Sequence, residues 1–261
     1  MACPSDSFTL ASSSLLLDAS IVPWDSAIYQ FPIASILNFQ VLDPSASAKD
    51  YAGFEDWLNA HHCRMVSCRL GHEKLRESMF LEDRGFRFVE MMLHPVFDGL
   101  QSLKIPDQAL NVLPATSADI DEILAIAESA FTNERFYIDP RLPRDCSHQR
   151  YGRWARSALN HPRQKLLKIM DEDVLVAFFV VEEDGAQSAY WHLTAVSPLQ
   201  HGKGYGHRTW LSVLKYHQDN GMKQVRTSIA ARNSAVLNLY SKLNFRFQAP
   251  EMTFHWIRSE D

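Results

Sequence analysis

Three glycines at alternate positions, Gly202, Gly204 and Gly206, are the residues whose spacing points most directly to chemistry. They follow residues 190–196, where polar and apolar side chains alternate as in a strand, and they precede a helical stripe of apolar residues that starts at Trp210. Glycine lets the backbone approach a ligand closely, and the free N–H groups of a helix's first turn attract anions. The sequence therefore predicts a loop that binds a phosphate or pyrophosphate group.

The glycine loop differs from two common nucleotide-binding motifs. It lacks the Gly-Lys-Ser/Thr ending of a P-loop, and its spacing is not that of a dinucleotide-binding fold. With its preceding strand and following helix, it resembles motif A of the GNAT superfamily of N-acetyltransferases. Gly204 and Gly206 then stand for the two signature glycines, and His201 replaces the usual Arg or Gln.

This resemblance implies acetyl-CoA as the co-substrate, without a metal. It implies that the backbone of Thr194 and Val196 pairs with the pantetheine arm, while residues 202–207 hold the pyrophosphate. The cofactor-binding residues expected on this basis are Thr194, Ala195, Val196, Gly202, Lys203, Gly204, Tyr205, Gly206, His207 and Asn233.

Tyr240 is the first candidate catalytic residue. By resemblance, it stands where the family places a tyrosine that protonates the leaving thiolate, seven residues after Asn233. Seven residues are about two helical turns, so both side chains would share one helix face. The alternative is that Tyr240 is a core aromatic residue whose hydroxyl is hydrogen-bonded.

His192 is the second candidate, as the base that acetylation of an amine requires. Two positions at which relatives carry a base are Ser228 and Tyr190 here, and neither is a carboxylate. His192 shares the expected strand face of Tyr190, and histidine side chains ordinarily titrate near neutral pH. We therefore predict that His192 acts as the base, directly or through water, with a structural role as the alternative.

An arginine-rich segment is the candidate acceptor site. Residues 135–163 contain seven arginines against Asp139 and Asp145, in a chain whose net charge is −5. Guanidinium groups suit phosphate oxygens, and aromatic rings suit a base or sugar face. The alternative is a solvated helix face. The predicted acceptor-binding residues are Arg135, Tyr137, Arg150, Tyr151 and Trp154.

A narrower resemblance supports this substrate class. Residues 22–32, 130–136 and 150–154 are similar to segments of dTDP-fucosamine (dTDP-4-amino-4,6-dideoxygalactose) N-acetyltransferases, although Ile28 and Gln30 replace a Phe and a Gly. The resemblance implies a nucleotide-linked amino sugar as acceptor. Two alternatives stay open: a GNAT enzyme that acetylates another small amine or a peptide or protein amine, and a CoA-binding module without catalysis.

The elements that position these residues predict an α/β protein with a mixed sheet. Residues 111–261 give the order β-α-α-β-β-β-α-β-α-β, which is the GNAT arrangement, and we expect them to form the catalytic domain. Residues 1–105 are expected to form a smaller lobe, with strands at 33–42, 65–69 and 86–93 and helices at 51–60 and 73–83. Residues 1–14 look loose, and 94–110 look like a linker.

The smaller lobe resembles a degenerate half of a GNAT domain. Residues 64–90 align with 223–249 without a gap, at an offset of 223 − 64 = 159, and Phe86 then matches Phe245. At the same offset the glycine loop falls on residues 43–47, which contain no glycine. We infer a repeat whose first copy has lost the cofactor site, with chance similarity as the alternative.

The composition of the chain limits the classes of protein to which it can belong. An apolar content of 46% and a charged content of 22% are typical of globular proteins, and the acidic balance argues against nucleic-acid binding. No apolar run has membrane-spanning length, and we expect no signal peptide. The four cysteines have no zinc-site spacing, and we expect them to be reduced thiols in a cytoplasmic protein. The expected partners are a small-molecule amine and, as an open alternative, a second copy of the chain.

Overall fold

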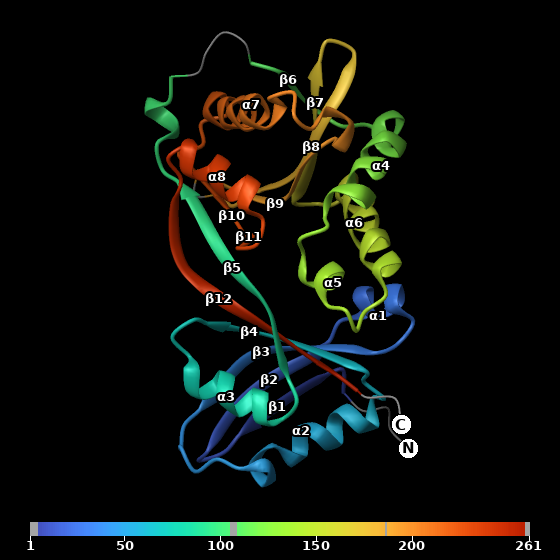
Figure 1. The fold of residues 1–261 in the computed structure, drawn as a ribbon, viewed down its shortest axis with the longest axis vertical. Helices are drawn as coiled ribbons and strands as arrows, with labels where there is room; N and C mark the ends of the chain where they lie inside the picture. Colours follow the sequence, from blue (N-terminus) through green and yellow to red (C-terminus); the bar gives the residue numbers. More distant parts are fainter. Residues whose placement is uncertain (1–4, 105–108, 186, 259–261) are drawn as a thin grey trace. The chain divides into compact units, whose positions relative to one another are not determined.

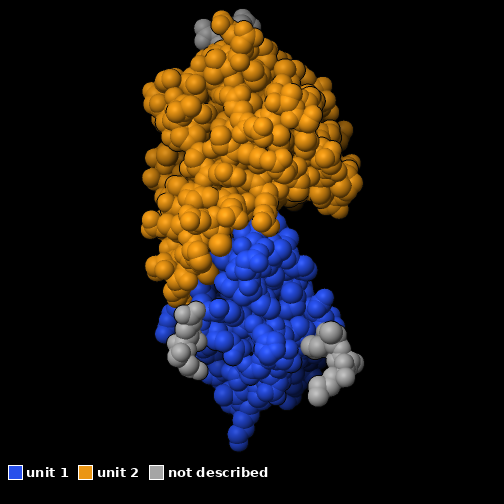
Figure 2. All heavy atoms as spheres, turned by 90° about the vertical axis from the view of Figure 1, so that its right-hand side faces the viewer, with its two compact units in different colours: residues 1–92, 249–261 blue, residues 93–248 orange. Residues whose placement is uncertain are grey.

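The structure, a computed structural model, describes residues 5–104, 109–185 and 187–258. The chain divides into two compact units, which are coloured separately in Figure 2. Unit 1 consists of residues 1–92 and 249–261, and unit 2 of residues 93–248. All the predicted site residues belong to unit 2.

Unit 1 is built on a sheet with the strand order β1-β2-β3-β4-β12. Strands β3 and β4 are parallel, and the other neighbours are antiparallel (Figure 1). Its elements are β1 (Ser7–Ala11), β2 (Leu15–Ile21), α1 (Pro23–Tyr29), β3 (Ile33–Val41), α2 (Ala48–Ala60), β4 (Met65–Gly71), α3 (Leu75–Asp83), the start of β5 (Arg87–Phe97) and most of β12 (Arg246–Ile257).

Two expectations for the N-terminal part were wrong. Ser7–Ala11 is a strand, because it pairs with β2 along its whole length, although its serine-rich surroundings look unstructured. Strand β5 continues to Phe97, into the expected linker 94–110, and a short 3₁₀ helix follows at Leu100–Ser102. Residues 105–108 of that linker lie outside the described residues.

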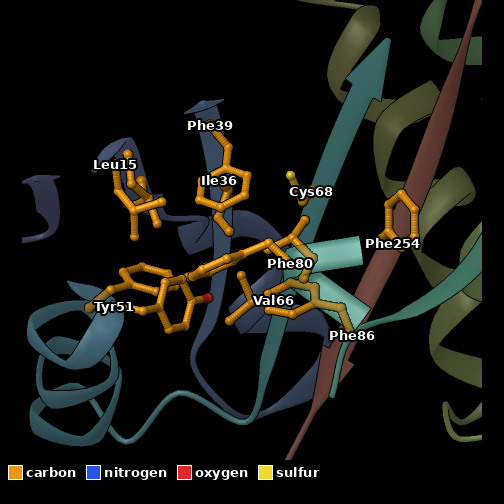
Figure 3. Packing of buried hydrophobic residues seen from close by; sticks show 14 of the residues in the cluster. Leu15, Ile36, Phe39, Tyr51, Val66, Cys68, Phe80, Phe86 and Phe254 are labelled. Atoms are coloured by element: carbon orange, nitrogen blue, oxygen red, sulfur yellow. The ribbon is translucent and has the colours of Figure 1, made fainter. Parts of the chain in front are cut away.

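An aromatic core fills unit 1 (Figure 3). The rings of Phe39 and Phe80 lie 5.6 Å apart, and Tyr51 makes an edge contact with Phe80 at 5.7 Å. Phe254, on β12, belongs to the same buried cluster. Burial of each large apolar side chain contributes about 1.5–3 kcal/mol, so β12 is part of the packing of unit 1.

Residues 111–258 confirm the predicted GNAT element order and add the short helix α5 and the two-residue strand β11. Most of these elements lie in unit 2. Its strand order is β5-β10-β9-β8-β7-β6, and β8 has both faces buried, as its apolar sequence VLVAFFVVEE requires. The elements are β6 (Asn111–Pro114), α4 (Ile120–Ala130), α5 (Arg135–Ile138), α6 (Arg144–Ala158), β7 (Gln164–Asp171), β8 (Val174–Glu183), β9 (Ser188–Val196), α7 (Tyr205–Asp219), β10 (Gln224–Thr227), β11 (Ile229–Ala230) and α8 (Ser234–Lys242).

The inferred internal repeat has matching element boundaries. Adding 159 to the bounds of α3 gives those of α8, and adding it to the start of β5 gives the start of β12. Phe86 and Phe245 follow the two helices at equivalent positions and are both buried. Strands β3 and β9 are both nine residues long and are related by an offset of 155. Local sequence likeness therefore accompanies a repeated strand–helix–strand structure.

The two copies of the repeat exchange their last strands. Strand β12, from the second copy, pairs with β4 of unit 1, where Trp256 faces Val66. Strand β5, from the first copy, pairs with β10 of unit 2, where Phe97 faces Val225. Both pairs are related by the same offset of 159. The compact units are consequently not the linear segments 1–105 and 111–261 that we expected, because each sheet is completed by a strand from the other copy.

Within the described ranges, no helix is long and apolar enough to cross a membrane.

Candidate active site

Strand β9 has an irregular pairing that opens one of its edges. Its register with β8 shifts so that Leu193 faces Val180 and Trp191 faces Val181, which leaves His192 as the extra residue of a β-bulge. Pairing with β10 on the opposite edge ends at Trp191. Beyond that point, β9 and β10 separate.

The bulge decides which backbone groups face the open edge. The N–H of Ser197 donates to the carbonyl of Val176, on the β8 side. Since backbone groups alternate along a strand, those of Ala195 also face β8, and those of Thr194 and Val196 face the opposite edge. This edge offers the hydrogen-bonding groups that the resemblance assigns to the pantetheine arm, with Ala195 between them.

The glycine loop leads into α7 close to the end of β9. Gly202 (φ 77°) and Gly204 (φ 79°) have left-handed backbone conformations that favour glycine, and a Cβ atom at either would meet no heavy atom within 4 Å. Gly204 is the N-cap of α7, and Gly206 lies in the first helical turn. The first-turn N–H groups of a helix lack intrahelical partners, so this loop has the geometry of an anion site.

The side chains of this loop point to different surroundings. Lys203 is exposed, and its Nζ donates to Gln200 at 3.0 Å, while His207 is exposed. The Tyr205 hydroxyl donates to Asp171 at 2.8 Å, and Arg208 contacts the same carboxylate oxygen at 3.1 Å. These hydrogen bonds lower the pKa of Asp171. Tyr205 therefore anchors the start of α7 to the end of β7.

Tyr240 lies in the buried core beside the open edge. Its side chain is 1% exposed, and its ring centroid is 6.3 Å from that of Trp210. Burial raises the pKa of Tyr240, and polar groups of Trp210, Thr227 and Thr194 act in the opposite direction. The proximity of Thr194 brings Tyr240 to β9, as the predicted acid role requires, but the same burial fits the alternative of a core residue.

Asn233 has a structural task in this protein. It is the N-cap of α8, and its Oδ1 accepts a hydrogen bond from the N–H of Val236 at 3.3 Å. The residue is thus held at the start of α8, two turns before Tyr240. Its predicted contact with CoA stays a prediction and would involve the amide nitrogen.

His192 is held by groups from three elements. Its Nε2 lies 3.0 Å from Oε2 of Glu182 on β8, and its ring centroid lies 4.8 Å from that of Tyr190 and 5.9 Å from that of Trp154 on α6. Arg163 pairs with the other oxygen of Glu182. This arrangement joins the predicted base to a residue of the predicted acceptor region.

Glu182 is the site residue that sequence reasoning missed. Burial acts to raise its pKa, but the hydrogen bonds from His192 and Arg163 outweigh burial, and the net shift is downward. A signal was present, because residues 174–182 are mostly apolar, and the hairpin that they form with the strand from 190 onward sets Glu182 opposite Tyr190.

The arginines of 135–163 fall into different environments. Arg153 and Arg156 are exposed on α6, whereas Arg150 is 8% exposed and its Cζ lies 4.4 Å from the ring centroid of Phe136 and 5.7 Å from that of Trp154. Arg141 pairs with the buried Asp139 at 2.8 Å. Only part of the segment therefore resembles a solvated face.

The other predicted acceptor residues lie around Arg150. Tyr151 is buried and stacks on Phe131 at 4.5 Å, which makes it part of the hydrophobic packing between α6 and its neighbours. The Cζ atom of Arg135 lies 4.7 Å from the ring centroid of Phe136, and the Cζ atom of Arg144 lies 5.1 Å from that of Tyr137. Trp154 donates through Nε1 to Gln164 at 3.2 Å. Aromatic rings and guanidinium groups thus alternate along α5 and α6.

Strand β3 of unit 1 carries the equivalent bulge, but its open edge is occupied. Leu37 is the extra residue, and the pairing with β4 ends at Ile36. The Phe39 carbonyl accepts a hydrogen bond from Lys74 Nζ at 3.3 Å, and the Val41 N–H donates to Glu77 Oε1 at 3.1 Å. Phe39 and Val41 correspond to Thr194 and Val196, so side chains of this unit already use the backbone groups in question.

Fold and site together define an α/β protein with two related copies, of which the second has an open strand edge beside the glycine loop. A family model described as the acetyltransferase (GNAT) family matches residues 121–245. This segment, which contains β9, the glycine loop and Tyr240, is thus similar to the GNAT family.

Individual relatives are distant. Over 142 residues, the chain is 21% identical to the spore coat polysaccharide biosynthesis protein SpsD of Bacillus subtilis. This match covers 54% of the chain and 49% of SpsD, so the chain spans about half the length of that relative. A GCN5-related N-acetyltransferase from Sphaerobacter thermophilus is 13% identical, with a TM-score of 0.63 over 96% of this chain and 83% of that one. A tandem GNAT protein from the clavulanic acid biosynthesis pathway is 12% identical, with a TM-score of 0.60 over 95% and 80%. These structures share the fold.

No group of three or more metal-ligating side chains is present among the residues that the structure describes.

Proposed function

We propose that this protein transfers the acetyl group of acetyl-CoA to the amine of a nucleotide-linked sugar. The observation that carries the proposal is the position of Trp154, whose ring lies beside both the buried Arg150 and the candidate base His192. A group that recognises a phosphate-bearing acceptor is thereby adjacent to a group that can accept its proton. The similarity to dTDP-fucosamine N-acetyltransferases points to the same acceptor class.

The donor half of the site consists of the open edge and the glycine loop. Acetyl-CoA supplies an activated acetyl thioester. The backbone of Thr194 and Val196 would hold its pantetheine arm, and the loop containing Gly202 and Gly204 would bind its pyrophosphate, since the space where their side chains would stand contains no protein atom within 4 Å. Tyr240 would donate its hydroxyl proton to the departing thiolate.

The acceptor half consists of His192 and the arginine–aromatic segment. His192 would take a proton from the acceptor amine, and Arg150 and Arg135 would bind the diphosphate through charge-assisted hydrogen bonds. SpsD carries a name that refers to polysaccharide biosynthesis, which agrees with a sugar substrate. The acidic overall charge would repel such a ligand, so a local arginine cluster has a clear purpose.

The test compares acceptors and arginine variants by thiol release from acetyl-CoA. A dTDP- or UDP-linked amino sugar should be acetylated with a much lower KM than the free amino sugar. Arg150→Ala should raise that KM about 10–100-fold, since a charge-assisted hydrogen bond contributes about 1.5–3 kcal/mol. The matched control is Arg153→Ala, which removes an exposed arginine from the same helix and should leave the KM unchanged.

The same experiment can reject the substrate class. If the free amino sugar, a polyamine or a peptide amine is preferred, the enzyme acetylates another amine. If no amine in the panel releases thiol while acetyl-CoA still raises the melting temperature, the protein is a CoA-binding module without catalysis.

A further inference from the structure

We propose that Glu182 is a positioning residue for the reaction: its carboxylate accepts the Nε2–H of His192 and thereby leaves Nδ1 as the atom that takes the proton of the acceptor amine. The inference rests on the proposed function, because it assigns a task to a residue next to the proposed base. Neither the family match nor the resemblance supplies this role.

The geometry is that of a directed hydrogen bond between two neighbouring strands. His192 Nε2 and Glu182 Oε2 are 3.0 Å apart, and both side chains are mostly buried, with 21% and 13% exposure. Glu182 sits opposite Tyr190 in the β8–β9 register, two residues before the histidine. A strand pair is a rigid support, so the imidazole cannot turn freely.

The bulge gives His192 its unusual location. As the extra residue between Trp191 and Leu193, it lies where β9 leaves β10 and the open edge begins. Bulges often re-aim a side chain next to an active site. A histidine that is aimed in this way needs a partner to hold its ring, and Glu182 is the carboxylate within reach.

The charged groups around the pair favour an ionised Glu182. Arg163 pairs with Oε1, the oxygen that His192 does not use, and Arg150 lies behind Trp154 on α6. The remaining neighbour from β9 is the phenol of Tyr190. With one oxygen bound to Arg163, the carboxylate offers Oε2 to the imidazole, and a carboxylate can only accept. The Nε2 position must then carry the hydrogen.

This fixed tautomer suits proton removal. A neutral imidazole with hydrogen on Nε2 has its lone pair on Nδ1, and no hydrogen bond to His192 Nδ1 is present within the described part of the chain. Nδ1 takes the proton from the amine as the new N–C bond forms. The C–S bond breaks, and the thiolate receives the proton of Tyr240. Glu182 stabilises the imidazolium until His192 loses its proton to water, and Tyr240 regains a proton from water, which restores both side chains.

The experiment uses two substitutions that separate hydrogen bonding from charge. Glu182→Met has a similar length but no acceptor, and Glu182→Gln keeps an acceptor oxygen without the charge. The readouts are kcat, the KM for acetyl-CoA, and the ¹⁵N chemical shifts of the His192 ring, which report the tautomer. Glu183→Gln is the matched control, since it removes the adjacent carboxylate, which pairs with Lys165 at 2.7 Å rather than with His192.

We expect wild-type His192 to carry hydrogen on Nε2. Glu182→Met should lose this tautomer and reduce kcat about 10–100-fold, within the range that acid–base catalysis contributes. Glu182→Gln should keep part of the Nε2–H tautomer and part of kcat, and Glu183→Gln should behave as wild type. The KM for acetyl-CoA should be the same in all three variants. A merely structural carboxylate would change the melting temperature but not the tautomer.

Two results would overturn the proposal: hydrogen on Nδ1 in the wild type, or wild-type kcat in folded Glu182→Gln and Glu182→Met. If Glu182→Met does not fold, Glu182→Gln provides the test alone. An altered His192 tautomer with an unchanged kcat in Glu182→Gln would also reject the proposal. The tautomer measurement needs no acceptor. It therefore remains decisive for Glu182 even if no nucleotide-linked amino sugar is acetylated, a result that would reject the proposed function instead.

Discussion

Gly206 offers a substitution that should leave folding intact and remove donor binding. It lies in the first turn of α7 without a left-handed backbone, and an added Cβ would meet only Leu239 Cδ2, at an ordinary contact distance of 3.7 Å. Replacing glycine in a helix gains up to about 1 kcal/mol in propensity. An aspartate at this position also interacts favourably with the helix dipole, by about 0.3–1 kcal/mol. Gly206→Asp should therefore melt at or slightly above the wild-type temperature.

The same carboxylate should oppose the pyrophosphate of acetyl-CoA. At a ligand concentration of 100 times Kd, binding stabilises the wild type by about 2.7 kcal/mol, which corresponds to a rise in Tm of roughly 5–10 °C for a unit of this size. If Gly206→Asp weakens binding 100-fold, the stabilisation falls to about 0.4 kcal/mol and the rise to about 1 °C. Differential scanning calorimetry with and without acetyl-CoA measures both quantities.

Two further substitutions make the result specific. Gly204→Asp should also remove the ligand effect, but its left-handed backbone should cost the free protein about 1–2 kcal/mol. Gly53→Asp, at an exposed helical glycine of unit 1, should leave the ligand effect unchanged. A folded Gly206→Asp protein that acetyl-CoA stabilises as much as wild type would refute the assignment of the loop.

Three other outcomes are expected. Tyr240→Phe should lower kcat about 100-fold with little change in acetyl-CoA affinity, and near-normal turnover by the folded variant would make Tyr240 a core residue. Titration calorimetry should find one acetyl-CoA per chain, because Lys74 and Glu77 occupy the edge of β3; two sites would contradict this. Burial lowers the pKa of His217 from 6.5 to about 4, so as the pH falls the unfolded chain takes up the proton first. The contribution of neutral His217 to the free energy of unfolding is complete above pH 6.5 and should be lost as the pH falls from 6.5 to 4. The loss should reach about 2 kcal/mol at pH 5. Urea unfolding of His217→Gln should show a smaller loss than wild type.

Local patterns in the sequence were sufficient for the elements around the glycine loop. Alternation along residues 190–196, the three glycines and the stripe from Trp210 are short-range signals, and the observed β9, loop and α7 follow them. Phe86 and Phe245 revealed the repeat because both must fill a core after an equivalent helix. Such features depend on residues that are close together in the chain.

Features that depend on distant residues escaped sequence reasoning. Nothing in the periodicity of β12 distinguishes pairing with β4 from pairing within its own copy, because either arrangement buries Phe254 and its neighbours. Glu182 was hidden for a related reason, since a glutamate at the end of a strand is ordinarily a solvated residue. Its role depends on the bulge at His192, and a bulge is not visible as a change in side-chain alternation.

The comparison of β3 with β9 shows how one backbone arrangement can be retained while its use changes. Both strands have nine residues, both carry a bulge at the equivalent position, and both separate from a parallel neighbour. In unit 1 the helix after that neighbour has Lys74 at its N-cap position and carries Glu77, a donor and an acceptor that bind backbone groups of the separated edge. In unit 2 the equivalent positions are Asn233, whose oxygen caps its own helix, and Val236, whose side chain has no polar atom. Since buried backbone groups need partners, two side chains determine which copy satisfies its edge internally and which can offer it to a ligand.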